Sequence, residues 1–261
     1  MRRFPATLWL RTTLPAVAAA VALTGFGPAP AVRPSAPPPC AATPAPALYG
    51  GEVRRLPTQR RVVALTFNAA WNEDGLADVL RVLRDKHAPA TFFPTGQFAE
   101  RHPRAVRAMA AAGHGIGSHS HSHPHFSALT PAQARHEVLR AHRALRAAAG
   151  TCPLPFFRFP YSETTPQRIA EVNGLGFADI EFSADTNGYK GPGGGMSTEA
   201  AVRRALDALG PGEIVQMHVG TPDGSGTVLD ARALPRIIDA VRERGYRITD
   251  LREHVRAAAS S

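Results

Sequence analysis

Hydrophobic positions from about residue 60 onward form short apolar runs that alternate with longer amphipathic segments. Residues 61–67 are apolar and β-branched, which predicts a buried strand. Residues 73–87 carry apolar side chains at i, i+3, i+4 and i+7, which predicts a helix with one apolar face. Further strands are expected at 90–93, 156–159, 178–183, 213–217 and 246–249, and further helices at 103–112, 130–149, 165–176, 197–210 and 230–245. Such alternation is typical of a parallel β/α architecture.

Local signals mark several of the expected boundaries. Thr130 and Gln133 flank a proline in the pattern of a capping box, and Gly150 closes the helix that they open. Pro235 predicts either a kink or a late start in the last helix. Residues 188–195 are rich in glycine and are expected to form a loop.

Polar residues follow several of the predicted strands. They are Asn68, Arg158, Tyr161, Asp185 and His218. Each has an ordinary structural explanation when it is taken alone. In a β/α barrel, however, chemistry is found where the strands end, so their shared placement predicts that they face one mouth.

Four of the eleven histidines fall within seven residues, at positions 119, 121, 123 and 125. Imidazole is a common ligand of zinc and similar ions. One helical turn would place His119 and His123 on the same face, where they could share an ion, while His121 would point elsewhere. The alternatives are a solvated surface loop or a weak, adventitious metal tract.

The N-terminus predicts an export signal over residues 1–31. Arg2 and Arg3 open it, an apolar stretch covers residues 14–26, and small residues at 29–31 fit a cleavage site. We expect a secreted or cell-envelope protein with no stable membrane span after processing, although an uncleaved anchor stays open. Residues 32–58 are expected to form an extended Pro/Ala-rich tether, and residues 59–256 a single domain.

Charge and cysteine content narrow the function classes. The formal charge of +9 comes mainly from arginines spread over many segments, which favours a solvated basic surface over nucleic-acid binding. A bridge between Cys40 and Cys152 is chemically allowed outside the cell. It is disfavoured here because Cys40 lies in the expected tether.

Five short motifs resemble those of the polysaccharide deacetylases, carbohydrate esterase family 4. The motifs are Thr66-Phe-Asn68, His119-Ser-His-Ser-His123-Pro, Arg158-Phe-Pro-Tyr161, Asp185 and Met217-His218, and they span roughly residues 60–250. The resemblance implies a distorted (β/α) barrel, here of about seven parallel strands. It also implies a divalent metal, usually zinc, and hydrolysis of acetyl groups on chitin-type or peptidoglycan-type glycans.

The resemblance also assigns roles to residues. His119 and His123 match metal ligands, and His218 matches a general acid tuned by Asp185. Arg158 matches the arginine that orients the catalytic carboxylate. Tyr161 matches the residue whose backbone N–H holds the oxyanion that forms when water activated by the metal attacks. Tyr161, Tyr189 and Met217 are the expected substrate contacts.

The first motif departs from the family pattern. Asn68 and Ala69 stand where the family has two aspartates, a base and a metal ligand. An amide cannot accept a proton from water, and a methyl group cannot bind a metal. Asn68 could coordinate through its amide oxygen, or a carboxylate of Glu73 or Asp74 could replace the missing base or ligand. We take Asp74 as the third ligand.

Further alternatives remain open. His121 or His125 could complete the metal shell, or the protein could bind glycan without turnover. Gly188 and Tyr189 also replace an acidic residue and a tryptophan of the family pattern. We expect an exported monomeric N-deacetylase, with a catalytically impaired glycan-binding relative or a hydrolase of small amides as alternatives.

Overall fold

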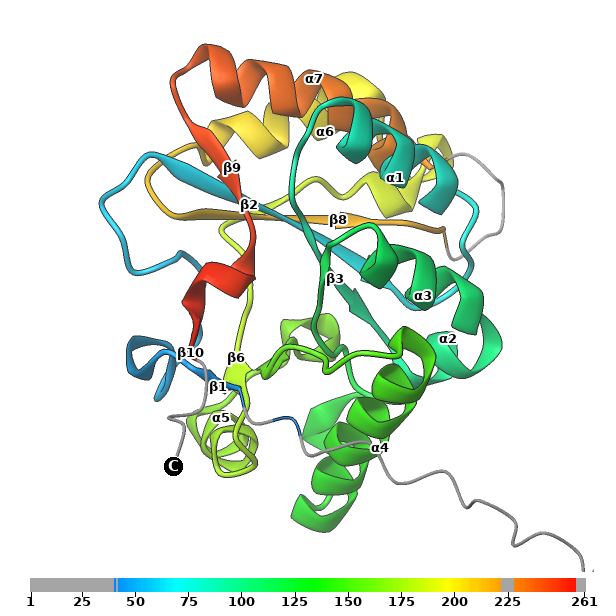
Figure 1. Ribbon diagram of the computed structural model, residues 1–261, viewed down its shortest axis with the longest axis vertical. Helices are drawn as coiled ribbons and strands as arrows, with labels where there is room; N and C mark the ends of the chain where they lie inside the picture. Colours follow the sequence, from blue (N-terminus) through cyan, green and yellow to red (C-terminus); the bar gives the residue numbers. More distant parts are fainter. Residues whose placement is uncertain (1–39, 41, 222–227, 257–261) are drawn as a thin grey trace, which may run out of the picture. The chain divides into compact units, whose positions relative to one another are not determined.

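The computed structural model describes residue 40 and residues 42–221 and 228–256. Its main sheet has six strands, and every strand pairing in it is parallel. The order is β4 (Gly115–Ile116), β3 (Thr91–Pro94), β2 (Val62–Ala69), β8 (Glu213–His218) and β7 (Ala184–Asp185), with β9 (Arg247–Thr249) beside the first half of β2 (Figure 1). The expected parallel α/β fold is confirmed.

A second parallel pair, β5 (Phe156–Phe157) and β6 (Ala178–Asp179), continues the sheet toward a barrel. A bridge between Ser118 and Phe157 connects it to the chain that follows β4. On the other side, the segment 53–55 bridges Ile180 and then Glu213 at the start of β8. The ring of strands is therefore completed by irregular segments, which is a distorted barrel in one domain.

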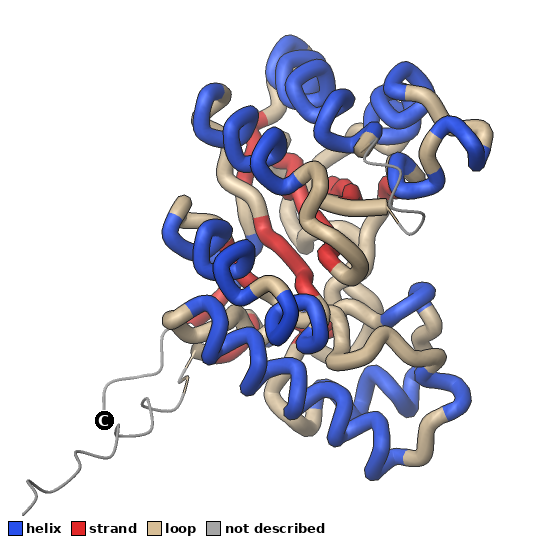
Figure 2. Tube along the Cα trace, turned by 90° about the vertical axis from the view of Figure 1, so that its right-hand side faces the viewer, coloured by secondary structure: helices blue, strands red, loops and turns tan. Residues whose placement is uncertain are grey.

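Seven helices occur in the described part of the chain, and they surround the strands (Figure 2). They are α1 (Leu76–Asp85), α2 (Gly96–Arg101), α3 (Pro103–Ala111), α4 (Pro131–Ala149), α5 (Pro166–Asn173), α6 (Thr198–Asp207) and α7 (Leu229–Glu243). The described residues also form short 3-10 turns: η1 (Pro46–Leu48), η2 (Phe126–Ala128), η3 (Pro160–Ser162), η4 (Gly188–Lys190), η5 (Pro192–Gly194) and η6 (Leu251–His254). Among these residues, no helix is long and apolar enough to cross a membrane.

The two-residue period of β2 separates two apolar cores. Val63, Leu65 and Phe67 pack in the large cluster that includes residues of α1, α3, α6 and α7. Val62 and Ala64 belong to a second cluster with residues of β5, β6 and the segment before β2. Successive side chains of a strand point to opposite faces. The inner face of β2 therefore continues from Ala64 to Thr66 and Asn68.

Some expected boundaries were wrong. Helix α2 was missed because Gly96 and Arg101 bound only six residues, too few for a periodic pattern. Of the strand expected at 178–183, only Ala178–Asp179 forms a strand, β6, and β7 follows beyond that range and pairs with a different neighbour. Pro235 lies inside one continuous helix, and the capping box of α4 forms as expected.

The expected boundary at residue 59 lies too late. Residues 43–44 form β1 (Thr43–Pro44), which pairs with β10 (Val255–Arg256), and Leu48 and Leu56 are buried in the second core. These apolar side chains are spaced too irregularly to reveal an element, so composition alone suggested a tether. The expected export signal and residues 32–39 lie outside the described residues.

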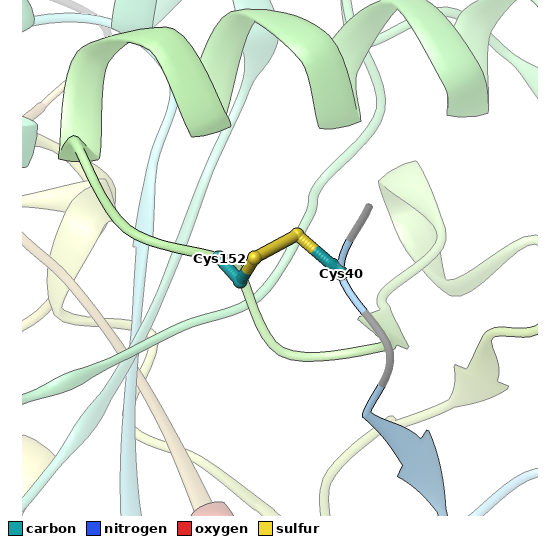
Figure 3. Close-up of a disulfide and its surroundings, with 2 residues drawn as sticks. All are labelled: Cys40 and Cys152. Atoms are coloured by element: carbon teal, nitrogen blue, oxygen red, sulfur yellow. A yellow bond between two sulfur atoms is a disulfide. The ribbon is translucent and has the colours of Figure 1, made fainter. Parts of the chain in front are cut away.

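Cys40 and Cys152 form a disulfide (Figure 3). This corrects the expectation that no bridge forms. Cys40 directly precedes the segment that packs on the domain, and Cys152 lies between α4 and β5. The two cysteines are separated by 112 positions in the sequence, so the bridge closes a long loop of chain.

Candidate functional site

The carboxyl ends of the strands surround a cavity of about 280 Å³. Seven of the residues singled out in the sequence line it: Asn68, His119, His123, Tyr161, Asp185, Tyr189 and His218. Arg158 is fully buried and hydrogen-bonds to Asn68 in the cavity wall. The polar residues that follow separate strands therefore meet at one mouth.

The imidazoles of His119 and His123 converge in this cavity, with their Nε2 atoms 3.2 Å apart. The expected helical turn that would place both histidines on one face does not form. Ser120 and His123 have left-handed backbone conformations, so the chain forms a tight turn, in which His123 N–H donates to Ser120 Oγ. His119 Nδ1 lies 2.9 Å from the carbonyl oxygen of Arg158. That carbonyl can only accept, so Nδ1 carries the proton and Nε2 keeps its lone pair.

Burial affects the charge of this pair. It holds the pKa of His119 well below its usual value, and it also lowers the pKa of His123. Both imidazoles are therefore neutral near pH 7. A neutral imidazole with a free Nε2 is the form that binds a metal.

None of the candidates for a third ligand joins the pair. His121 Nε2 lies 3.1 Å from Glu100, and His125 Nδ1 lies 2.6 Å from Glu163. Glu73 faces His102 at 3.5 Å. In the described part of the chain, no three His, Cys, Asp or Glu side chains gather to hold a metal ion.

Asp74 is thus not brought to the histidine pair, which corrects the expected ligand set. It lies exposed in the turn before α1, where its N–H faces Asn72 Oδ1 at 3.4 Å, and it does not line the cavity. Ala69 is buried in the core on the helix-facing side of β2. The donor set therefore fits a divalent ion held by two imidazoles. It falls one ligand short of the three that catalytic zinc sites usually have.

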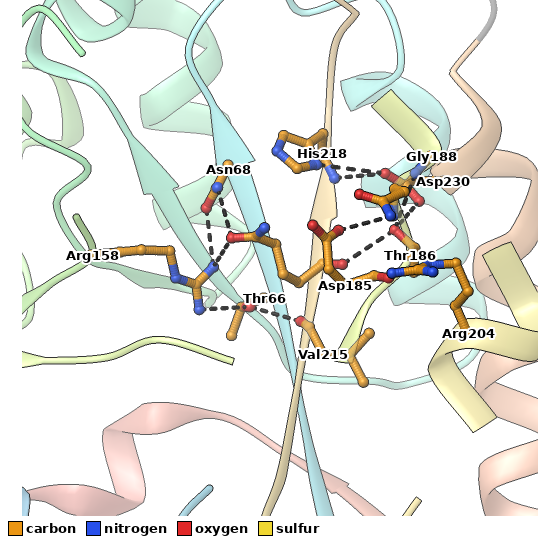
Figure 4. Close-up of polar contacts among 12 residues, drawn as sticks. Thr66, Asn68, Arg158, Asp185, Thr186, Gly188, Arg204, Val215, His218 and Asp230 are labelled. Carbon is orange, nitrogen blue, oxygen red and sulfur yellow. Dashed lines mark hydrogen bonds and ion pairs between the residues drawn. The ribbon is translucent and has the colours of Figure 1, made fainter. Parts of the chain in front are cut away.

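Arg158 holds Asn68, which lines the cavity, within a network of polar contacts (Figure 4). Its guanidinium donates to Asn68 Oδ1 at 3.0 Å, to Thr66 Oγ1 at 3.0 Å and to the carbonyl oxygens of Ile180 and Glu181 at 2.9 and 3.2 Å. Burial lowers its pKa to about 10, so it stays charged near neutral pH. A buried charge needs such a set of partners.

Asn68 is held at both ends of its amide. Besides accepting from Arg158, it donates from Nδ2 to Gln216 Oε1 at 3.0 Å. Gln216 also hydrogen-bonds to Asp185, whose pKa is raised by burial. Asn68 therefore occupies the position beside the buried guanidinium, but it has no group there that can accept a proton.

Tyr161 lies in the 3-10 turn η3 after β5. Tyr161 and Ser162 both adopt left-handed backbone conformations, which are uncommon outside glycine. Buried Glu181 holds the turn because it accepts from Phe159 N–H at 3.2 Å and from Ser162 Oγ at 2.8 Å. The Tyr161 ring stacks on His125, with 4.0 Å between the ring centroids.

The carboxylate next to His218 is Asp230, at the start of α7. Asp230 Oδ2 accepts a hydrogen bond from the backbone N–H of His218 at 2.8 Å and lies 3.9 Å from Nδ1 of the His218 ring (Figure 4). Asp185, the partner expected from the family resemblance, instead accepts from Asn187 N–H at 2.8 Å. Burial lowers the pKa of His218 to about 3, and burial raises the pKa of Asp230 to about 7.

Aromatic rings form one wall of the cavity. Trp71 stacks on His218 at 5.8 Å between centroids, and Tyr189 lies 5.8 Å from Trp71 and 4.6 Å from His218. Met217 was expected to contact substrate, but it lies in the outer core. The reason is the period of β8, which turns Gln216 and His218 inward and the residue between them outward.

Sequence reasoning missed Trp71, Gln216 and Asp230. The same period could have identified Gln216, which is two positions before His218. Trp71 follows Asn68 by three positions in the loop after β2, which is a weaker signal. Asp230 reaches the site only because α7 packs beside β8, and no local pattern indicates that.

Comparisons with known proteins agree with this fold. The sequence profile of the polysaccharide deacetylase family matches residues 55–180. A chitooligosaccharide deacetylase of Bradyrhizobium sp. (strain ANU 289) is 35% identical over 199 residues, which cover 73% of this chain and 89% of that protein. A peptidoglycan-N-acetylglucosamine deacetylase of Bacillus cereus is 30% identical over 197 residues, covering 75% of this chain and 68% of that protein.

Solved structures share the architecture. A family 4 carbohydrate esterase from Streptomyces lividans in complex with acetate superposes with a TM-score of 0.63 at 28% identity, covering 74% of this chain and 93% of that one. A family 4 pseudoenzyme from Bacillus anthracis superposes with a TM-score of 0.70 at 23% identity, covering 78% and 69%, and shows the fold alone. The chain belongs to the polysaccharide deacetylases, carbohydrate esterase family 4.

Proposed function

We propose that this protein is an exported deacetylase that removes acetyl groups slowly from an N-acetylated glycan of the chitooligosaccharide or peptidoglycan class. The observation that carries the proposal is the single cavity in which His119, His123 and His218 meet above the buried Arg158. The deacetylases named among the relatives support the reaction type.

The aromatic wall favours a sugar over a small linear amide. Trp71 and Tyr189 lie next to each other and line the cavity, and aromatic rings can cover the apolar face of a pyranose ring. Tyr161 lines the cavity in a left-handed turn, and its N–H would hydrogen-bond to the acetyl oxygen. His218 would donate a proton to the departing amine, which is a poor leaving group without one.

His119 and His123 would hold a divalent ion, for which zinc is our first choice. When bound, the ion would supply Lewis-acid chemistry at the acetyl oxygen and the attacking water. Because two ligands bind more weakly than three, we expect one equivalent of zinc per chain with an affinity below that of three-ligand members of the family. Isothermal titration with zinc checks this, with H119A as the control. Chelation should remove acetate release, and added zinc or cobalt should restore it.

The low rate follows from Asn68, which cannot act as a base. Asn68→Asp should raise the rate of acetate release by about 10²–10⁴-fold, because the new carboxylate would lie beside Arg158 in the cavity wall. Gln216→Glu is the matched control, since it adds the same charge beside the same guanidinium but on another strand. It should raise the rate far less.

The assay is acetate release from N-acetylglucosamine oligomers and peptidoglycan fragments, with zinc or cobalt present. If neither the parent protein nor N68D releases acetate from any of these, the enzymatic proposal is overturned. A set of small amides in the same assay tests the remaining substrate class.

A glycan-binding protein without turnover is the second candidate. The specific observation in its favour is that both ends of the Asn68 amide are already hydrogen-bonded, to Arg158 and to Gln216. In that case oligosaccharide titration would show saturable binding to the parent protein, with no acetate released even over long incubation.

The disulfide and the N-terminal sequence support export. Disulfides persist in oxidising compartments and are rare in the cytosol. We expect the protein in the cell envelope or the medium as a monomer, which fractionation and size-exclusion chromatography would check.

A further inference from the structure

Gly188 has no room for a side chain, and the reason is Asp230. A Cβ atom added at Gly188 would lie 2.2 Å from Asp230 Oδ1 and 2.5 Å from its Cγ. The backbone of Gly188 is not left-handed, so its conformation would allow another residue. The carboxylate of Asp230 therefore fills the volume that a side chain at position 188 would take.

Asp230 is fully buried and is bonded at both oxygens. Oδ1 accepts from Thr186 Oγ1 at 2.6 Å, and Oδ2 accepts from His218 N–H at 2.8 Å. It also lies in the first turn of α7, where the helix dipole favours negative charge. These contacts fix the position of the carboxylate, and they account for its burial.

The His218 ring lies next to Asp230 but does not yet form a hydrogen bond with it. Its Nδ1 atom is buried and has no hydrogen bond within the described residues. Asp230 Oδ2 is 3.9 Å away, close enough for a small ring rotation to form the bond. No hydrogen bond joins Asp185 to this ring in the same part of the chain, because its carboxylate is engaged by Asn187 and Gln216.

We propose that Asp230 is the positioning residue of His218: it keeps a proton on Nδ1 and directs Nε2 to the substrate. His218 is neutral beforehand, and the water that attacks the acetyl carbon gives up a proton to its Nε2. When the carbon–nitrogen bond breaks, that proton passes to the departing amine, and the Nδ1 proton stays beside Asp230. The catalytic part of this inference rests on the proposed function, whereas the tautomer of His218 does not.

The tautomer is measured by ¹⁵N NMR of the histidine-labelled full chain at pH 8.5, above the pKa of about 7 to which burial raises Asp230, with the His218 signals assigned by loss in H218Q. The parent protein should show the Nδ1–H form. In Asp230→Asn the ratio of Nδ1–H to Nε2–H should fall about tenfold or more, since a hydrogen bond to a charged group is lost. Asp185→Asn is the matched control and should leave the ratio unchanged.

A double variant, called the swapped pair, controls for the possibility that the loss of Asp230 disturbs the fold. Asp230→Ala vacates the volume next to Gly188, and Gly188→Asp then brings a carboxylate to this region from the loop instead of from α7. The swapped pair should restore the Nδ1–H form, whereas Asp230→Ala alone should not. A purely structural role for Asp230 predicts lower thermal stability in D230N with the tautomer ratio unchanged, and that result would overturn the proposal. A shift in D185N with none in D230N would overturn it as well.

Kinetics in the N68D background separate this inference from the proposed function. There, D230N should lower kcat about tenfold or more, with a smaller change in KM, and the swapped pair should recover it. If N68D releases no acetate while D230N still shifts the tautomer, the proposed function fails and the positioning role of Asp230 stands. If acetate is released equally with and without D230N, the positioning role fails.

Discussion

At the scale of single residues, the direction in which each side chain points decides whether it belongs to the site. Asn68 and Ala69 are adjacent in sequence, but one faces the cavity and the other faces the helices. The family resemblance located the histidine pair, Arg158 and His218, because short motifs carry their spacing. It could not locate Asp230 or exclude Asp74, since both depend on how distant segments pack.

Arg158 offers a stability prediction at this scale. Arg158→Lys should lower the free energy of unfolding by about 2–4 kcal/mol, because an ammonium group cannot reach Asn68, Thr66 and two carbonyl oxygens at once. Urea denaturation measures the change.

Arg81→Lys provides the comparison, since Arg81 is about half exposed and pairs with acidic residues of its own helix. It should change stability by less than about 0.5 kcal/mol. Equal effects of the two substitutions would contradict the role given to the buried network.

At the scale of elements, strands and helices were predicted well where the hydrophobic period was long. The capping box of α4 and the apolar face of α1 are examples. The two-residue strands β5, β6 and β7 were less predictable, because their pairing is decided by neighbours far away in sequence. Segment 42–58 was missed for the same reason.

Strand β8 begins with Glu213, a buried carboxyl group whose protonation affects the stability of the fold. Glu213 is fully buried, its carboxylate oxygens have no hydrogen-bond partner within the described residues, and burial raises its pKa to about 7. The folded state thus favours the protonated acid. Its contribution to stability is full below the unfolded pKa of about 4.5 and is lost as pH rises through about 7.

Glu213→Gln should therefore stabilise the protein at pH 8 by up to about 3 kcal/mol and have little effect at pH 4.5. Thermal melts at the two pH values measure this. Glu243→Gln, at the exposed end of α7, should show no such dependence on pH. A stabilisation that is the same at both pH values would rule out the carboxyl group as its cause.

At the scale of the whole molecule, irregular segments complete the barrel, and the disulfide attaches one of them. Cys40 leads into β1, η1 and the bridge at Val53, and this segment contributes apolar side chains to the second core. This packing could not be predicted from the sequence, because the apolar residues of the segment have no period.

Opening the bridge should destabilise the fold by up to about 5 kcal/mol, since the unfolded chain would lose a constraint that closes a loop of about 112 residues. The free energy of unfolding is compared with and without a reducing agent. The double variant C40S/C152S should match the reduced parent and should not respond to the reducing agent. Unchanged stability of the parent on reduction would contradict a bridge that constrains the chain.

The contact between Gly188 and Asp230 has a consequence for variation in this protein. The acidic group beside His218 is attached to a long, well-packed helix, whereas the neighbouring stretch 188–195 has five glycines and forms only short 3-10 turns. Insertions or exchanges in that stretch can reshape the rim around Tyr189 while the acid stays in place. Libraries that aim to change sugar preference should therefore randomise residues 190–196 and leave α7 untouched.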